Sequence, residues 1–160
     1  MVYLLEDAGA DPTLLMKDAS TAFDWAVLSG DVPTMEYLAD HPRVDIAAMN
    51  RHGCAAVQWA ADAGNVETCR WLAAKGLDLS HVNKAKHGAV KKAAWKDHRP
   101  LLEWLLQAPD GPQLGWQLLL LDNKGRSVVE TTKLGGHAET AAWLQGLIDA
   151  SRPGPPSERS

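Results

Sequence analysis

Residues 55–76 read AAVQWAADAGNVETCRWLAAKG and contain two short helical patterns on either side of one glycine. The apolar stretch 55–63 has the length of a helix and stops at Gly64. Apolar residues then recur at helical spacing from Val66 as far as Gly76. We therefore expect Gly64 to form the turn between two helices and Gly76 to end the second helix.

The same pattern recurs along the chain, and its aromatic residues show the period. An aromatic-Leu pair returns roughly every 33 residues, with a wider step of about 39 before the last pair. The pairs begin at Tyr37, Trp71, Trp104 and Trp143, and the turn position seven residues earlier holds Gly30, Gly64, Asp97 and Gly136. Four helix pairs are therefore expected. Most of the seven tryptophans, including Trp25 and Trp59, are then expected to pack between stacked units.

Helix start signals occupy the expected positions. Thr21-x-x-Asp24 and Ser127-x-x-Glu130 match capping boxes, in which the hydroxyl accepts a free backbone N–H and the acid reaches back. Asp31 and Asn65 are suitable N-caps for second helices. These signals predict the helix boundaries independently of the apolar pattern.

A helix, a glycine turn, a second helix and a Gly-Ala-Asp exit at this period resemble the ankyrin repeat. The matching residues are Gly9-Ala10-Asp11, Gly76-Leu77-Asp78, Thr21 to Ala26, Asp122-x-x-Gly125-x-Ser127 and Gly136-His137. The chain departs from the family pattern at the first helix, which lacks its proline and has Asp24, Gln58, Lys91 and Glu130 in place of histidine. The resemblance implies an all-α helical solenoid of stacked helix-turn-helix units joined by β-hairpin-like loops.

The expected organisation is one ankyrin-repeat array over residues 1–150, followed by a Pro/Ser-rich disordered tail at 151–160. Its parts are a half repeat at 1–15, repeats near 16–49, 50–82, 83–121 and 122–150, and an insertion at 108–117. Leu118 to Leu121 is expected to be a buried run. In the half repeat, Val2 and Leu5 face a missing neighbour, so they are expected to contact an upstream segment of a longer protein or another subunit.

Composition excludes several classes of protein. A net charge of -4, with 46% hydrophobic and 22% charged residues, is unlike a wholly disordered chain or a strongly basic nucleic-acid binder. Cys54 and Cys69 are too few for a disulfide framework, and no apolar run approaches the roughly 20 residues of a membrane span. We therefore expect an intracellular protein, cytoplasmic or nuclear, with no membrane contact.

Catalytic and metal-binding motifs are not recognisable in the sequence. His52 and Cys54 form either a thiol–imidazole pair or half of a metal site, or they are variable residues of a loop; the repeat pattern favours the loop. The same pattern assigns Cys69 to the core and His98 and His137 to structural hydrogen bonds in the turns. The expectation is a protein that is not an enzyme and uses no cofactor or metal.

Charge is unevenly distributed along the chain. Residues 84–99 hold six basic residues against one acidic residue, whereas the first fifty hold nine acidic residues and two basic ones. A charge run is usually a solvated face. The resemblance, however, implies that partners dock on the loop tips and inner helices, which form a concave groove, and from the third unit onward these positions are mostly basic. The candidate partner-binding residues are Arg51, His52, Lys84, Lys86, His87, Trp95, Lys96, Lys124 and Arg126.

The leading hypothesis is a non-catalytic protein–protein interaction module that binds an acidic protein surface or segment, with Trp95 as apolar anchor. One alternative is a structural subunit of a larger assembly. Another is binding of nucleic acid or a phosphate ligand through the basic strip, against which the net charge argues. Trp95 and Trp116 are the tryptophans that the repeat leaves unexplained, and Trp116 is either a loop anchor or an exposed contact.

Overall fold

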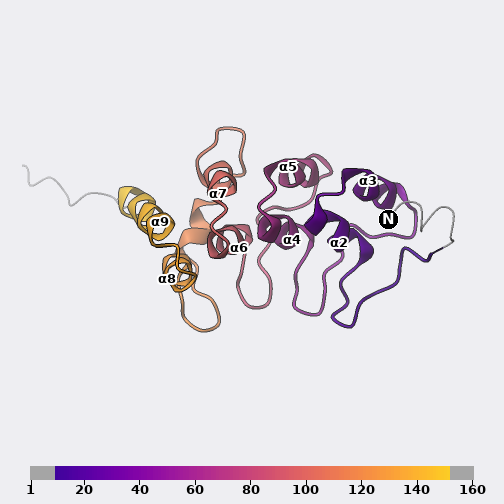
Figure 1. Ribbon diagram of the computed structural model, residues 1–160, viewed down its shortest axis with the longest axis horizontal. Coiled ribbons are helices and arrows are strands. Elements are labelled where there is room, and N and C mark those ends of the chain that lie inside the picture. Colours follow the sequence, from indigo (N-terminus) through magenta and orange to yellow (C-terminus); the bar gives the residue numbers. More distant parts are fainter. Residues whose placement is uncertain (1–9, 152–160) are drawn as a thin grey trace, which may run out of the picture.

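Two rows of helices build the chain in the computed structural model, which describes residues 10–151 (Figure 1). The inner row is α2 (Ala22–Ser29), α4 (Ala56–Ala63), α6 (Ala89–Trp95) and α8 (Val128–Leu134). The outer row is α3 (Val32–Asp40), α5 (Val66–Ala74), α7 (Arg99–Leu106) and α9 (Ala138–Ser151), and a 3-10 helix, η1 (Gly115–Leu119), follows α7. Residues 10–151 contain no β-strand, so the predicted all-α solenoid is confirmed. Val2, Leu5 and the tail beyond Ser151 lie outside the described residues.

Side chains cap the helices as the sequence predicts. The Thr21 hydroxyl accepts the Asp24 N–H at 3.1 Å, and the Asp24 carboxylate accepts the Thr21 N–H at 2.9 Å. Ser127 and Glu130 form the same reciprocal pair at the start of α8. Both capping boxes are confirmed, and each satisfies two backbone donors that the helix itself leaves free.

The turn between the two helices of a unit also sets the spacing between units. Gly64 has φ of 72°, in the left-handed region that favours glycine. A Cβ on Gly64 would lie 2.4 Å from the His98 ring, whose Nε2 is 2.9 Å from the Asp62 carbonyl oxygen. This contact confirms the structural role predicted for His98. Asp97 takes the same left-handed conformation in the next unit and accepts a hydrogen bond from Thr140 of the following one.

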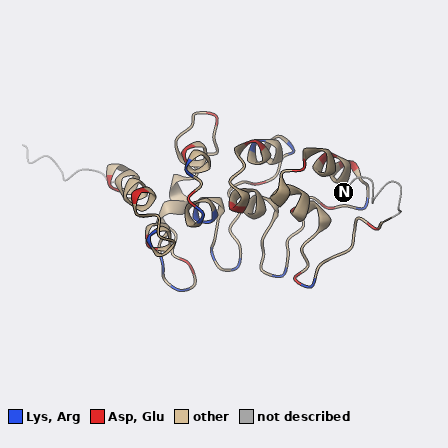
Figure 2. Cartoon of the chain, in the orientation of Figure 1, with Lys and Arg blue, Asp and Glu red and all other residues tan. Residues whose placement is uncertain are grey.

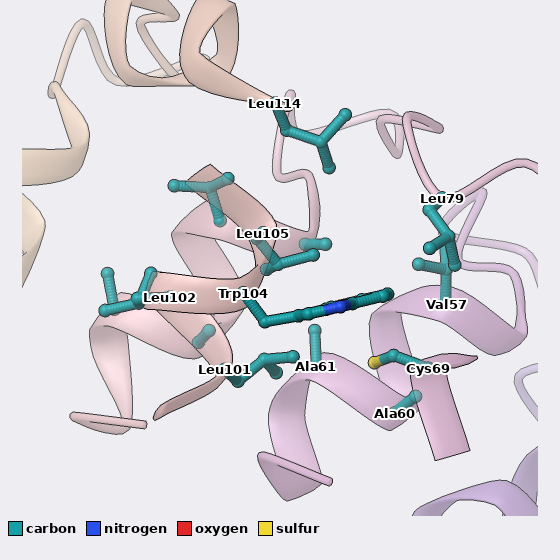
Figure 3. Close-up of a cluster of buried hydrophobic side chains, with 14 of the residues drawn as sticks. Val57, Ala60, Ala61, Cys69, Leu79, Leu101, Leu102, Trp104, Leu105 and Leu114 are labelled. Atoms are coloured by element: carbon teal, nitrogen blue, oxygen red, sulfur yellow. The ribbon is translucent and has the colours of Figure 1, made fainter. Parts of the chain in front are cut away.

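The core lies between the two rows and runs through successive units. Figure 3 shows Trp104 extending from α7 toward Ala61 and Cys69, which belong to the preceding helix pair. Trp104 is buried, and a cation covers each tryptophan of this repeating position: Lys75 on Trp71, Arg70 on Trp104 and Arg99 on Trp143. The predicted packing of these outer-helix tryptophans is confirmed.

Hairpin loops extend below the inner helices in Figure 1. One recurring side-chain arrangement stabilises them. In the loops at 50–54, 83–87 and 122–126, the first residue accepts two backbone N–H bonds through Oδ1. Backbone bonds also join neighbouring tips, as from the Arg51 N–H to the Asp18 carbonyl at 2.8 Å and from the Lys84 N–H to the His52 carbonyl at 3.1 Å. The tips therefore form a continuous, ordered edge.

The segment that follows the insertion differs from the sequence prediction. Leu118 is buried, but Leu119 is 68% exposed and Leu121 is 52% exposed, so the expected buried run at Leu118 to Leu121 is wrong. The cause is the 3-10 turn, which buries Gln117 and Leu118 and leaves Leu119 facing outward.

Gln117 completes the fold of a helix that lies earlier in the chain. Gly88 precedes α6 and has no side chain to cap it, and the Gln117 Oε1 accepts the Val90 N–H at 3.1 Å instead. Its Nε2 donates to the Ser80 carbonyl at 3.1 Å. A Cβ on Gly88 would lie 2.3 Å from the Gln117 Oε1, so the glycine leaves space for this cap.

Replacing Gln117 tests this long-range cap. Q117A should lower the free energy of unfolding by about 2 kcal/mol, because α6 loses its N-cap and the partly buried Ser80 carbonyl loses its donor. G88A should also destabilise, since the new methyl displaces the Gln117 amide. In the double variant that amide is already gone, so its cost should be close to that of Q117A alone. Urea unfolding of all three proteins measures the coupling.

Q107A is the matched control, because Gln107 is an exposed glutamine that ends α7. Its effect should stay within about 0.5 kcal/mol. Strict additivity of G88A and Q117A would contradict the proposed contact.

Candidate functional site

The nine residues singled out from the sequence lie along the hairpin loops and at the end of one inner helix. Figure 2 shows basic residues at the tips of the loops below the inner helices. Arg51, His52, Lys84, Lys86 and Lys124 are exposed tip residues, whereas Trp95 and Lys96 end α6. We call the surface formed by these tips and the inner helices the inner face.

Four of the nine residues meet in one hollow of the inner face, which we call the basic pocket. Its volume is about 370 Å³. It is lined by His87, Trp95, Lys96 and Arg126, which the sequence singled out, and by Asp62, Lys91, Lys92, Asp122 and Thr131. Arg51, Lys84, Lys86 and Lys124 do not line it, and His52 lines a neighbouring hollow with Cys54 and Trp59.

A buried ion pair forms the floor of the basic pocket. The Lys91 ammonium lies 3.0 Å from the Asp122 Oδ2 and also donates to the Arg126 carbonyl at 2.8 Å. Both side chains are almost entirely buried. Hydrogen bonds from the Arg126 backbone N–H and from the Lys91 ammonium hold the pKa of Asp122 well below its ordinary value. A fixed carboxylate and a fixed ammonium thus link α6 to the next hairpin loop.

Two further side chains lie close to the same carboxylate oxygen without a short hydrogen bond to it. His87 Nε2 is 3.7 Å and Arg126 Nε is 3.5 Å from the Asp122 Oδ2. Burial, followed by the positive charge of Lys91, lowers the pKa of His87, so its ring is neutral at neutral pH. The Arg126 Nε is buried and has no hydrogen-bond partner within residues 10–151.

Part of the basic run is neutralised inside the protein. Lys91 pairs with Asp122, and Lys92 lies 3.4 Å from Asp62. The exposed Lys84 ammonium keeps its charge and donates to the Arg51 carbonyl at 2.8 Å. Lys86, Lys96 and Lys124, by contrast, are exposed and form no ion pair within the described part of the chain. The surface charge is therefore smaller than the sequence count suggests and is concentrated on fewer residues.

When the repeat units are aligned, the buried Lys91–Asp122 pair corresponds to two uncharged residues of the preceding units. Lys91 occupies the position of Gln58, and Asp122 occupies the position of Asn83. Gln58 and Asn83 are also buried, so an alignment of the units places two opposite charges at neighbouring buried positions. Lys91 was counted only as part of the basic run, so its ion pair with Asp122 was not predicted.

The burial of Trp25, Trp59 and Trp116 agrees only in part with the packing expected from the repeat. Trp25 and Trp59 contact each other across two units, with ring centroids 6.0 Å apart, yet Trp25 remains 43% exposed. Trp116 is 46% exposed and lines an apolar hollow with Leu119 and Leu147. Of the two alternatives for Trp116, the exposed contact describes the structure better than the buried anchor.

The chemistry available in the basic pocket is that of fixed charges beside an aromatic ring. The Thr131 hydroxyl, which lines the pocket, donates to the carbonyl of Ser127, the N-cap of its own helix.

Outside the pocket, burial raises the pKa of the Cys69 thiol to about 12. Within residues 10–151 no group of three or more His, Cys, Asp or Glu side chains is arranged to hold a metal ion, and no helix has the length and apolar character needed to cross a membrane.

Comparison with known proteins identifies the family of the chain. A family model for ankyrin repeats, in three copies, matches residues 1–83. No curated protein sequence matches the chain significantly.

Replacing Asp122 with Asn, the residue at the equivalent position 83 of the preceding repeat, tests the ion pair. D122N keeps the oxygen that accepts the loop N–H groups but leaves Lys91 buried and unpaired, so it should cost about 3 kcal/mol. The double variant K91Q/D122N reproduces the Gln58 and Asn83 arrangement and should recover most of that loss. Urea unfolding of the wild type, both single variants and the double variant gives the coupling energy.

The same proteins should differ in their response to acid. Folding lowers the pKa of Asp122, so its contribution to stability is present above the unfolded-state pKa, near 3.8, and is lost as the pH falls below it. The free energy of unfolding of K91Q/D122N should therefore decrease less than that of the wild type between neutral pH and pH about 3. Equal slopes would show that this carboxylate does not carry the effect.

Proposed function

Because the chain belongs to the ankyrin-repeat family, whose repeats are generally protein–protein interaction modules, we propose that it is a non-catalytic module binding an acidic protein surface or segment through its inner face. The contact residues of this proposal are Arg51, His52, Lys84, Lys86, His87, Trp95, Lys96, Lys124 and Arg126. Its partner is another protein. An intracellular location, cytoplasmic or nuclear, fits the two free, buried thiols of Cys54 and Cys69.

The observation that carries the proposal is the set of unpaired cations on one face. Lys86 and Lys124 are exposed at neighbouring loop tips, and Lys96 is exposed at the end of α6. An acidic partner gains from all three without displacing an internal ion pair. Lys91 and Lys92 contribute less, because each already has a carboxylate.

Order in the loops supports the same function. Asn83 and Asp122 each fix their loop through two backbone N–H bonds, and the Asn123 side chain donates to the Lys84 carbonyl of the neighbouring tip at 2.9 Å. A surface that is already ordered loses little conformational entropy when a partner binds. The tips are therefore suited to contact a partner in the conformation described here.

Acidic residues on the inner face argue against a nucleic-acid partner. Asp18 lies at the first loop tip, and Asp62 and Asp122 line the basic pocket. Carboxylates at these positions repel a phosphate backbone, and the whole chain carries a net charge of -4. A structural subunit is the other alternative, and its contact face at Val2 and Leu5 lies outside the described residues.

Charge reversal at the loop tips tests the proposal. Lysine-directed cross-linking and mass spectrometry in a native extract identify the partner and the lysines that it contacts. K86E/K124E should then weaken binding of that partner by at least about tenfold, or 1.4 kcal/mol, because two attractive contacts become repulsive. Affinity measured by titration at two salt concentrations should also fall as the salt rises.

The matched control is R43E/K75E, which changes the net charge equally outside the loop tips. Arg43 and Lys75 form exposed ion pairs with Asp11 and Asp40, which contribute little to stability. This variant should bind within about twofold of the wild type. Cross-links confined to lysines outside the inner face, such as Lys75 at the end of α5, or full affinity of K86E/K124E, would refute the inner-face assignment.

A further inference from the structure

The geometry points to the basic pocket as the subsite that receives one acidic side chain of the partner, with an adjacent apolar residue of the partner resting on Trp95. This inference rests on the proposed function and adds to it the kind of segment that is bound. The segment carries an Asp or Glu next to an apolar residue. The loop tips attract the partner by charge, and the basic pocket selects this local sequence.

Arg126 provides the first argument. Its guanidinium lies near Asp122, at 3.5 Å from Nε to Oδ2, but the Nε is buried and makes no hydrogen bond within residues 10–151. A buried donor without an acceptor is costly, and an Arg fork binds a carboxylate through two parallel hydrogen bonds. The side chain as a whole is 37% exposed, so a carboxylate entering the pocket can accept hydrogen bonds from the exposed part of the guanidinium group.

The charges around the pocket fit a single negative charge. Three of its four cations already face a carboxylate, because Lys91 and Arg126 both lie close to Asp122 and Lys92 lies close to Asp62. His87 is neutral at neutral pH, and Lys96 forms no ion pair within residues 10–151, so a ligand would be attracted mainly by Lys96, with Arg126 beside it. One carboxylate satisfies these two groups, whereas a phosphate dianion would bring a second negative charge close to two fixed carboxylates.

Trp95 supplies an apolar wall next to these charges. The residue is 43% exposed at the end of α6, and it lines the pocket beside Lys96. The volume of about 370 Å³ lies near the lower end of the range of ligand sites, so the pocket has room for one or two side chains rather than an extended chain. Trp and Arg are enriched among the residues that contribute most to binding at the centres of protein interfaces.

The floor of the pocket is rigid, which favours selective binding. Lys91 is fixed by two hydrogen bonds and Asp122 by backbone N–H groups from Lys124 and Arg126. Neither side chain has to be ordered when a ligand enters. Binding therefore depends on the free groups, Arg126, Lys96 and Trp95.

Peptide selection on the whole chain tests the inference. Random peptides displayed on phage are selected against the wild-type chain, and a selected peptide is synthesised for affinity measurement. We expect the selected sequences to share an Asp or Glu beside an apolar residue. Replacing that acid by its amide should weaken binding at least about tenfold, and the Trp95 indole resonance should shift on binding.

Variants of the chain locate the contact. W95A and K96A should each weaken binding of the synthetic peptide about fivefold or more, whereas W116A and K75A should stay within about twofold. W116A is the matched control for W95A, because the two tryptophans are exposed to similar extents, 46% and 43%. A pocket that takes no acidic side chain would bind the acid and amide peptides equally, or would tolerate W95A and K96A.

Three other outcomes would overturn the inference for different reasons. Tighter binding of a phosphoserine version of the peptide would assign the pocket to phosphate. Loss of binding in K86E/K124E but not in W95A or K96A would refute the pocket and leave the proposed function standing. Binding that none of these variants affects would refute both.

Discussion

The left-handed turn between the two helices of each unit is the constraint on which the solenoid depends. In the first three helix pairs of the described chain, the turn residue reverses the chain within its unit and is touched by a side chain of the next unit. Asn65 lies against Gly30 and His98 against Gly64, while Thr140 donates to Asp97. The turn therefore sets both the angle between the two helices of a unit and the distance to the next unit. Apolar burial between the rows then follows from this spacing, which explains why tryptophans of one unit reach the helices of the previous one.

The basic pocket is a product of the same stacking. Its floor joins Lys91 on one inner helix to Asp122 on the next hairpin loop, and these residues meet only because consecutive units are held in register. The free groups around them belong to α6 and to that loop. A binding site of this kind needs at least two units, so its geometry depends on the array rather than on any single repeat.

The sequence predicts the local features of the fold well and the long-range contacts poorly. Period, turns and the capping boxes at Thr21 and Ser127 follow from residues a few positions apart, and the structure agrees with them. The burial of Lys91 and the role of Gln117 depend on partners about thirty residues away, which no local pattern reveals. For the site, residue type pointed to His87, Trp95, Lys96 and Arg126, which line the basic pocket, and their role in binding stays a prediction. A count of charges overstated the free cations, because it could not show which ones are paired.

The cap that Gln117 provides to α6 also affects how this array can be taken apart. Repeat proteins are usually treated as strings of exchangeable modules, each stabilised by itself and its neighbours. Here the first helix of one unit takes its cap from a residue 27 positions further along the chain, beyond the second helix. Residues 88–117 thus form one indivisible cassette. A chimaera joined inside that cassette would separate a helix from its cap, whereas one joined at a hairpin loop would transfer both together.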